Sequence, residues 1–254
     1  MNKNKVFLIL LFFTLTFSFS SLAQEMNADA GKLYNEGNSL LKAGNYNGAI
    51  SSYDKALAIE KDYRIYYQKG VAQKKANDLN GSKASLEECL KLKNDFEPGY
   101  NALGGVFFSM GNYTEAINKF EKVLTLTDNA SVTKKVKKNL SLAYTKLGNE
   151  EISKGNASKA VEYLNQAVAN DNYDAAYLSL AKLYSELGEW DKSISAAENA
   201  LKHKSKITIG GPYFYMGVSY KGKGDTSKAT EMFDKAKQDP TYKTTAEYEL
   251  SLLK

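Results

Sequence analysis

The sequence repeats one segment, and this repetition limits the possible folds more than any other feature. Residues 44–62 (GNYNGAISSYDKALAIEKD) and residues 111–129 (GNYTEAINKFEKVLTLTDN) both begin with Gly-Asn-Tyr and continue with alanine, aromatic and leucine residues at helical spacing. Weaker copies begin at residues 77, 155, 188 and 224. A single unit of this size buries too little apolar surface to be stable alone, so the units are expected to stack into an array.

Three columns of mostly small residues recur at fixed offsets in these units. Successive members of the first column are 33, 34, 44, 33 and 36 residues apart, which gives six units. Antiparallel helices approach closely only where the facing side chains are small, so each unit is predicted to be a pair of packed helices. The columns are Gly37, Gly70, Gly104, Gly148, Ala181 and Gly217; Ala49, Ser82, Ala116, Ala160, Ser193 and Ala229; and Ala56, Cys89, Val123, Ala167, Ala200 and Ala236.

The two helices of each unit are separated by a residue suited to a left-handed turn. This residue is a glycine in five units and Asn77 in the second unit. Glycine, and next to it asparagine, adopts that conformation most readily at a helix C-terminus. Large side chains occupy the second helix of each unit except the fifth, where Ala197 stands and Trp190 is predicted to supply the missing volume. The turn glycines are Gly44, Gly111, Gly155, Gly188 and Gly224, and the large residues are Tyr53, Leu86, Phe120, Leu164 and Phe233.

Together these features resemble the tetratricopeptide repeat. The resemblance rests on the period near 34 residues, the helix–turn–helix unit, the glycine column followed by two small-residue columns, and the closing Asp239-Pro240 pair. It implies an all-α, right-handed superhelical solenoid of antiparallel helix pairs. The expected repeats are residues 30–62, 63–96, 97–130, 131–173, 174–209 and 210–242, and residues 243–254 resemble the capping helix that ends such arrays.

Two insertions interrupt the regular period. Residues 131–140 lengthen the fourth unit without a glycine or proline, which predicts one long helix over about Val132 to Lys154. We interpret its lysines as a solvated helix face, with a basic ridge for an acidic partner or lipid headgroups as the alternative. Residues 205–211 contain two glycines and are expected to loosen the joint between the last two units. The lysines of the first insertion are Lys134, Lys135, Lys137 and Lys138.

The first 23 residues have the pattern of a secretory signal peptide. Lys3 and Lys5 precede an apolar run over residues 6–19, and Ser21-Leu22-Ala23 offers a cleavage site. We expect cleavage after Ala23, with an uncleaved anchor as the alternative, and a tether over residues 24–29. The mature chain is then expected in the periplasm or outside the cell.

Composition excludes several classes of function. Removing Lys3 and Lys5 lowers the formal net charge from +5 to +3, which predicts no nucleic-acid footprint. The one histidine, His203, and the one cysteine, Cys89, have no zinc-ligand spacing, and Cys89 falls in a small-residue column typical of the core. No nucleophile elbow, phosphate-binding loop or dinucleotide fingerprint occurs. We therefore expect no catalytic residue, no metal and no cofactor.

The outward faces of the first helices are predicted to line the concave surface of the array. This face mixes aromatic, amide and cationic side chains, which is typical of a protein-binding surface. The expected function is a non-catalytic scaffold that binds a peptide or protein segment. The alternative is a glycan or small-ligand module in which Tyr34, Tyr67, Phe108 and Phe214 stack on the ligand. The candidate binding residues are Tyr34, Asn38, Arg64, Tyr67, Lys74, Asn101, Phe108, Asn149, Lys182 and Phe214.

Some tetratricopeptide-repeat proteins hold the C-terminal carboxylate of a chaperone in a clamp of lysine, asparagine and arginine side chains. Only Asn38 stands at a matching position here. Tyr34, Gln68, Pro98 and Ala102 occupy the other clamp positions, so a chaperone clamp is not expected. The pattern specifies neither the partner nor the oligomeric state.

Overall fold

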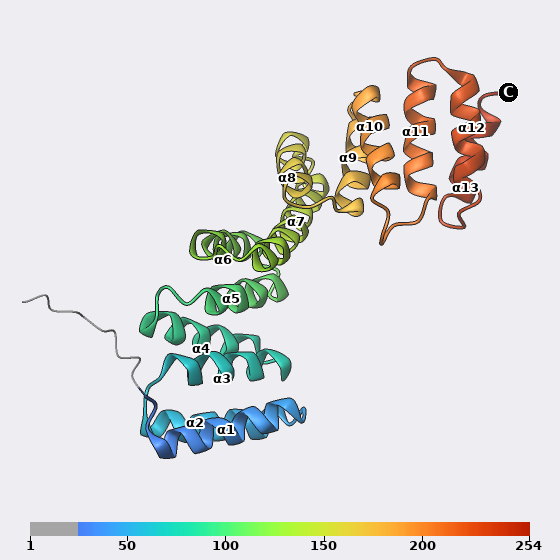
Figure 1. Cartoon of the computed structure of the whole chain (residues 1–254). Coiled ribbons are helices and arrows are strands. Elements are labelled where there is room, and N and C mark those ends of the chain that lie inside the picture. The colour runs from blue at the N-terminus through green and yellow to red at the C-terminus, as the bar shows by residue number, and fades with distance from the viewer. Residues whose placement is uncertain (1–24) are drawn as a thin grey trace, which may run out of the picture.

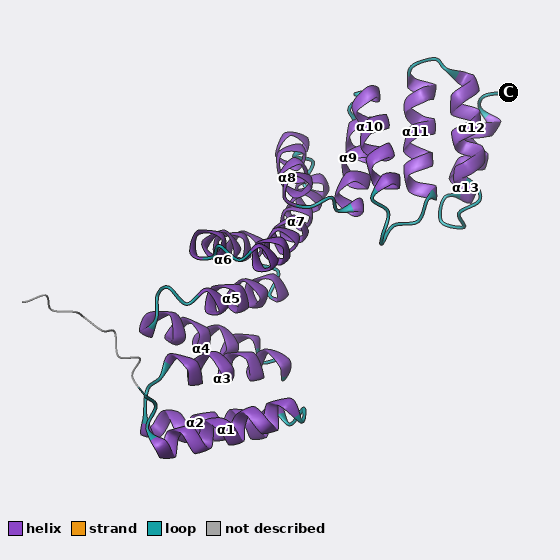
Figure 2. Ribbon diagram, viewed as in Figure 1, coloured by secondary structure: helices purple, strands orange, loops and turns teal. Residues whose placement is uncertain are grey.

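The computed structural model describes residues 25–254, and every regular element in that range is an α-helix (Figures 1 and 2). The predicted signal peptide and its cleavage site lie outside the described residues. Over residues 25–254, no helix combines the length and the apolar character needed to cross a bilayer. The helices are α1 (Ala28–Lys42), α2 (Tyr46–Ile59), α3 (Tyr63–Lys75), α4 (Leu79–Leu92), α5 (Glu97–Ser109), α6 (Tyr113–Leu126), α7 (Ala130–Ser153), α8 (Ala157–Asn170), α9 (Asp174–Glu186), α10 (Trp190–Lys202), α11 (Gly210–Gly222), α12 (Thr226–Ala236) and α13 (Lys243–Ser251).

Consecutive helices pack as pairs, and the pairs stack along the chain. Figure 1 shows α1 to α6 stacked in a first arm and α9 to α13 in a second arm, with α7 and α8 at the bend between them. This arrangement confirms the predicted all-α solenoid. The bend places one face of α7 beside the first arm, which determines where the candidate site lies.

Within each pair, a glycine of the first helix lies against a large side chain of the second helix. A Cβ atom added at Gly37 would lie 2.5 Å from the ring of Tyr53, and one added at Gly104 would lie 2.7 Å from the ring of Phe120. Any side chain there would push the helices apart, so the glycine column is required by close packing. The same contact joins Gly70 to Leu86, Gly148 to Leu164 and Gly217 to Phe233.

The fifth pair, α9 and α10, departs from this rule on both sides. Ala181 stands where the other pairs have glycine, and the facing residue is Ala197; both are fully buried. The prediction that Trp190 fills this gap is wrong, because its ring lies against Gly222 of α11, 2.6 Å from where a Cβ atom would be. Trp190 therefore packs between this pair and the next one. Ala181 is one methyl group larger than the glycine of the other pairs, and Ala197 is smaller than their facing side chain.

The predicted turn residues are confirmed. Gly44, Gly111, Gly155, Gly188 and Gly224 all have φ between 73° and 80°, and Asn77 is the one residue other than glycine with positive φ among residues 25–254, at 64°. The backbone N–H of Asn45 donates to the Leu40 carbonyl at 2.9 Å, as in a Schellman turn. The Asn45 side chain then accepts from the Gly48 N–H at 3.0 Å and begins α2.

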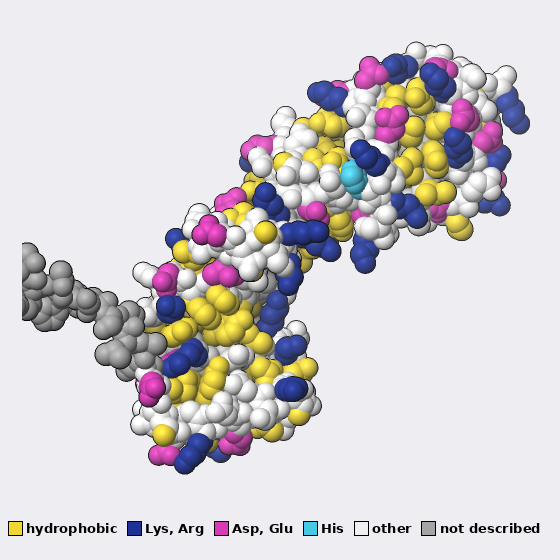
Figure 3. Space-filling view, viewed as in Figure 1, with side chains coloured by type: hydrophobic (Ala, Val, Ile, Leu, Met, Phe, Trp, Pro, Cys, Tyr) yellow, Lys and Arg dark blue, Asp and Glu magenta, His cyan; other side chains and the backbone are white. Residues whose placement is uncertain are grey.

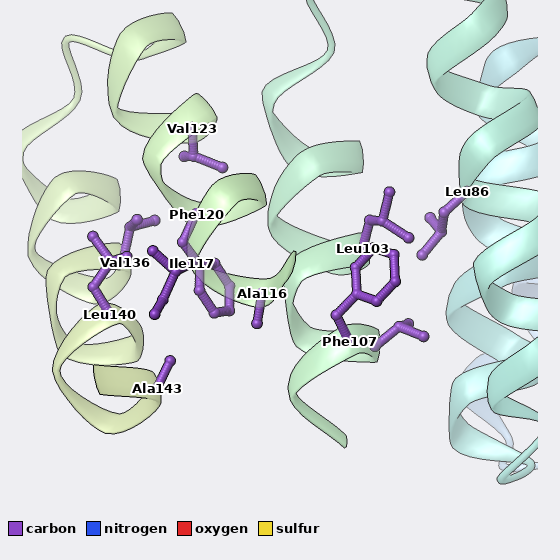
Figure 4. Close-up of a cluster of buried hydrophobic side chains, with 11 residues drawn as sticks. Leu86, Leu103, Phe107, Ala116, Ile117, Phe120, Val123, Val136, Leu140 and Ala143 are labelled. Atoms are coloured by element: carbon purple, nitrogen blue, oxygen red, sulfur yellow. The ribbon is translucent and has the colours of Figure 1, made fainter. Parts of the chain in front are cut away.

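The core of the first arm continues into α7. Figure 4 shows Leu103 and Phe107 of α5 and Phe120 of α6 in the same buried cluster as Val136 and Leu140 of α7. Val136 and Leu140 lie in the predicted insertion, whose apolar side is therefore core. The C-terminal half of α7 pairs with α8, and Ile152 packs against the core of the second arm. At 24 residues, α7 is long enough to belong to both arms.

The N-terminal segment is more ordered than a tether. Met26 packs against the core of the first pair, and the Asn27 side chain accepts from the Asp29 N–H at 2.9 Å. Helix α1 accordingly begins at Ala28, inside the predicted tether of residues 24–29. At the other end, α13 buries Ala246 against α12, and Lys221 pairs with Glu249 at 2.7 Å.

The second insertion does not form the loose joint that its glycines predicted. The buried carboxylate of Asp174 accepts hydrogen bonds from the backbone N–H groups of Ser205, Lys206 and Ile207, with donor–acceptor distances of 2.6, 2.5 and 3.1 Å. Burial raises the pKa of Asp174, but these N–H groups outweigh it and hold the pKa below its ordinary value of 3.8. The loop is thereby fastened to the start of α9.

The Asp174→Asn variant tests this anchor. Loss of the charged acceptor is expected to lower the free energy of unfolding at pH 7 by about 1–3 kcal/mol. Because the folded pKa is depressed, the stabilisation is complete above the unfolded pKa of 3.8 and is lost as the pH falls through the folded value. Urea unfolding at several pH values should therefore show a smaller acid-induced loss in the variant than in the natural chain. Asp128→Asn, at an exposed carboxylate, is the matched control; equal stabilities of Asp174→Asn and the natural chain at pH 7 would contradict the anchor.

Candidate functional site

Two adjoining depressions lie where α3, α5 and α7 meet, and together we name them the α3–α5–α7 groove. Their volumes are about 490 Å³ and 210 Å³, and both are lined by Lys74, Gly105 and Asn139. The larger one carries more amide and ammonium groups, and the smaller one is lined mainly by apolar groups. The larger depression also includes Val71, Lys75, Asn101 and Ala102, and the smaller one Phe108, Ser109, Phe120 and Leu142.

Lys74 lies in the last turn of α3, and its ammonium group rests over the backbone of α5. A Cβ atom added at Gly105 would lie 2.8 Å from Lys74 Nζ, so the absence of a side chain at Gly105 makes room for the ammonium group. Within residues 25–254, Lys74 Nζ has no ion pair or hydrogen bond. Burial lowers the pKa of Lys74, because the charged form is poorly solvated there. The groove thus contains a recessed cation without a counterion.

Asn101 lies one helical turn before Gly105 on the same face of α5. Its Oδ1 atom is the one buried side-chain nitrogen or oxygen in the described part of the chain that has no hydrogen-bond partner. A buried acceptor left unpaired costs about 1–3 kcal/mol. Because this oxygen is buried, a ligand in the larger depression cannot reach it, although other atoms of Asn101 line that depression.

Helix α7 forms the third wall of the groove. Asn139, from the insertion, and Leu142, just after it, line this wall. Lys135 precedes them by four and seven residues and so shares their helix face. The four lysines of the insertion are exposed, and no aspartate or glutamate lines either depression. Figure 3 shows lysine and arginine side chains gathered around the bend between the two arms. The groove and its surroundings are therefore positively charged.

Three of the ten predicted binding residues, Lys74, Asn101 and Phe108, meet in this groove. Sequence reasoning missed Gly105, Asn139 and Leu142. Asn139 belongs to the insertion, so no equivalent position in the other units indicated its role. Gly105 follows Gly104, and only Gly104 belongs to the column of small residues.

The other predicted residues of the first arm are engaged in contacts within the array. Asn38 Oδ1 accepts a hydrogen bond from the Tyr53 hydroxyl at 2.8 Å. Arg64 donates from Nε to Asp62 Oδ1 at 2.9 Å at the start of α3. The remaining two, Tyr34 and Tyr67, are partly buried against core clusters.

The predicted residues beyond the groove do not join it. Asn149 is exposed on the C-terminal half of α7, and Lys182 of α9 lies 3.8 Å from Glu186. Phe214 packs in the C-terminal core, with its ring 5.7 Å from that of Phe233 and 5.5 Å from that of Tyr242. The ten residues therefore do not form one continuous surface.

The four aromatic residues suggested as stacking platforms already contact other rings. Tyr67 meets Phe96 edge to face at 5.2 Å, and Phe108 meets Tyr113 in the same way at 5.3 Å. Tyr34 lies 6.1 Å from the ring of Tyr53, and Phe214 is in the cluster described above. Sugar rings stack on free aromatic faces. Tyr34, Tyr67 and Phe214 pack against core clusters, and of the four residues Phe108 alone lines the groove.

The remaining chemically distinctive residues have structural surroundings. Cys89 is fully buried, as predicted, and burial raises the pKa of its thiol to about 12, which disfavours the reactive thiolate. His203 stacks on Tyr177, with ring centroids 5.9 Å apart. In the part of the chain that the structure describes, no three histidine, cysteine, aspartate or glutamate side chains are grouped so that they could hold a metal ion.

Comparison with known families agrees with this geometry. Sequence profiles of the tetratricopeptide repeat match residues 30–63, 63–96, 100–131 and 145–207, which together make up well over half of the chain. The chain is a tetratricopeptide-repeat protein. A comparison with curated protein sequences finds no match.

Solved tetratricopeptide-repeat structures resemble this one in fold. MamA is 26% identical and aligns over 72% of this chain and 94% of its own, with a TM-score of 0.50. YrrB, described as a tetratricopeptide-repeat protein with an unusual peptide-binding site, is 22% identical and aligns over 77% and 96%, with a TM-score of 0.52. PilF of Pseudomonas aeruginosa is 15% identical and aligns over 83% and 91%, with a TM-score of 0.50.

The adjacent glycines of α5 provide a matched test of the packing and of the groove. Gly104→Ala would place a Cβ atom 2.7 Å from the Phe120 ring and is expected to lower the free energy of unfolding by about 1–3 kcal/mol. Gly105→Ala displaces only the flexible end of Lys74 and replaces a helical glycine, so stability should stay equal or rise by up to about 1 kcal/mol. Urea unfolding of both variants measures the difference. Equal effects of the two substitutions would contradict the assigned packing.

Proposed function

We propose that this tetratricopeptide-repeat protein is a non-catalytic scaffold that holds a peptide or protein segment in the α3–α5–α7 groove. The observation that carries this proposal is Lys74, a recessed cation without a counterion within residues 25–254, beside a depression lined by Phe108, Phe120 and Leu142. A peptide offers both complementary groups, since its carbonyl or carboxylate oxygens accept from an ammonium group and its apolar side chains can fill the smaller depression.

The fold and the aromatic residues favour a peptide over a glycan. Tetratricopeptide-repeat proteins are generally non-enzymatic scaffolds, and the fold relative YrrB is described as having a peptide-binding site. A glycan site would need several aromatic faces open to a sugar, whereas Tyr34, Tyr67 and Phe214 pack against core clusters and Phe108 alone of the four lines the groove. The groove instead combines amide, ammonium and apolar groups, which is the mixture that a peptide segment requires.

Capture of partners with a variant whose groove is filled tests the proposal. Gly105→Gln puts a neutral, helix-compatible side chain where Lys74 Nζ lies, and it should abolish retention of the partner by the immobilised chain from Gln24 to Lys254. Ser51→Gln, on an exposed position of α2, is the control and should retain the partner. Bound proteins are identified by mass spectrometry after capture from a cell-envelope extract. Identical capture by both variants would exclude the groove as the binding surface.

The scaffold is proposed to act in the periplasm or outside the cell, because residues 1–23 have the pattern of a signal peptide. When the whole chain is expressed in a Gram-negative bacterium, the protein recovered from the periplasm or medium is expected to begin at Gln24. N-terminal sequencing and intact mass measure this directly. Replacing Leu8 and Leu11 with lysine should break the apolar run and keep the uncleaved chain in the cytoplasm. Retention of Met1 in the exported protein would indicate an uncleaved anchor instead.

A further inference from the structure

We propose that the connection between α10 and α11 docks the protein on a bilayer surface that carries anionic phospholipids. We name residues 202–209 the basic loop. Its three lysines face the lipid phosphates, and Ile209 enters the interface beside them. This inference goes beyond the proposed function, because it concerns one end of the second arm and uses no residue of the α3–α5–α7 groove.

The basic loop is longer than the connections between the other helix pairs. Seven residues, 203–209, separate α10 from α11, whereas three or four residues connect the other consecutive pairs. Figure 1 shows this connection at the same end of the second arm as the connection between α12 and α13. The additional residues are not needed to join two pairs. The shorter connections are residues 60–62, 93–96, 127–129 and 171–173.

The basic loop carries positive charge without a counterion. Lys202, Lys204 and Lys206 are exposed, and none of their ammonium groups has an ion pair or hydrogen bond in the part of the chain that the structure describes. The sequence has no aspartate or glutamate between residues 198 and 225. Such a cluster attracts an anionic surface over a Debye length of about 10 Å.

Two buried carboxylates fix the basic loop at both ends. Asp174 accepts from the N–H groups of residues 205–207, and Asp239 Oδ2 accepts from the Gly210 N–H at 3.2 Å. Both carboxylates bond to the main chain, so they leave the lysine side chains without a partner. A loop already held in one conformation loses little conformational entropy on docking.

Apolar side chains accompany these cations. Ile209 is 44% exposed, and Ile207 is partly buried. A basic segment with apolar side chains binds at the lipid interface, because the apolar groups enter the boundary while the lysine stems extend and keep their ammonium groups at the phosphates. Helix α7 also carries exposed lysines, but none of its large apolar side chains is exposed. The basic loop is therefore the better membrane contact of the two.

The composition of the basic loop favours lipid over an acidic protein. Lysine is depleted at protein–protein interfaces, where arginine, tyrosine and tryptophan are enriched. Residues 202–209 contain three lysines and none of those three residue types. A lysine binds phosphate as a point charge without a fixed geometry, which suits headgroups that move within the plane of a bilayer.

Co-sedimentation with vesicles tests this inference. The chain from Gln24 to Lys254 should bind vesicles made of equal parts phosphatidylglycerol and phosphatidylcholine, less so at high salt, and should not bind phosphatidylcholine alone. Changing the three loop lysines to glutamine should weaken binding by about tenfold or more, since each lysine near an anionic surface contributes roughly fivefold. The matched control changes Lys134, Lys135 and Lys137 of α7 to glutamine. It removes the same charge and should leave binding nearly unchanged.

A fluorophore at position 209 measures insertion directly. Cys89 is fully buried, so Ile209→Cys offers a single accessible thiol for labelling with nitrobenzoxadiazole. The emission of this label rises in apolar surroundings, and it should increase when the phosphatidylglycerol vesicles are added. The same label at Ser51→Cys, on an exposed position of α2, should not respond.

The outcomes distinguish the basic loop from its alternatives. Absence of binding to the phosphatidylglycerol vesicles, or equal binding by the loop variant and the natural chain, would overturn the inference. A larger loss in the α7 control would assign the membrane contact to α7 instead. Retention of an acidic protein through the loop lysines, without vesicle binding, would replace lipid with protein. Gly105→Gln should bind vesicles as the natural chain does, so the groove and the basic loop are tested separately.

Discussion

The structure depends on one contact, in which a large side chain of the second helix of a pair lies directly on a glycine of the first. Gly37 under Tyr53 and Gly104 under Phe120 set how closely the two helices approach. That distance brings the small residues of the other columns, such as Ala49 and Ala116, into full burial. Because the same contact recurs in five of the six pairs, the helices of these pairs approach each other in the same way. The fifth pair substitutes alanine on both sides and transfers its large side chain, Trp190, to the joint with α11.

Helix α7 converts this regular stack into a molecule with a specific recess. Its first three turns bury Val136 and Leu140 in the core of the first arm, and its last turns pair with α8 in the second arm. A helix is stiff along its axis, so sharing it between two cores couples the arms and positions the polar face of the insertion beside α3 and α5. Asn139 reaches the groove for that reason. The lysines of the insertion are exposed, as a solvated helix face requires, and one of them, Lys135, also shares the groove-facing side.

The groove shows how a repeat array can expose charged and polar side chains without disturbing its packing. Gly105 is adjacent to the packing glycine Gly104 but faces outward, where the absence of a side chain makes room for Lys74 Nζ. The buried contact of Gly104 with Phe120 holds α5 against α6 without involving Lys74. Side chains on the outer face of α5 can therefore differ without changing this contact.

The sequence by itself determined the helix pairs, their turns and the buried columns, because these follow from local periodicity and from residues with a single conformational role. For that reason Asn77, which replaces a glycine, could be predicted to form a left-handed turn. The sequence also indicated Lys74, Asn101 and Phe108 as surface residues. It grouped them with Phe214 and Asn38, which pack internally. Only the tertiary structure decided which of these residues meet, that Asp174 fastens the loop after α10, and that Asn139 completes the groove. These contacts join residues about 30 or more positions apart, and periodicity carries no information on how one pair is rotated against the next.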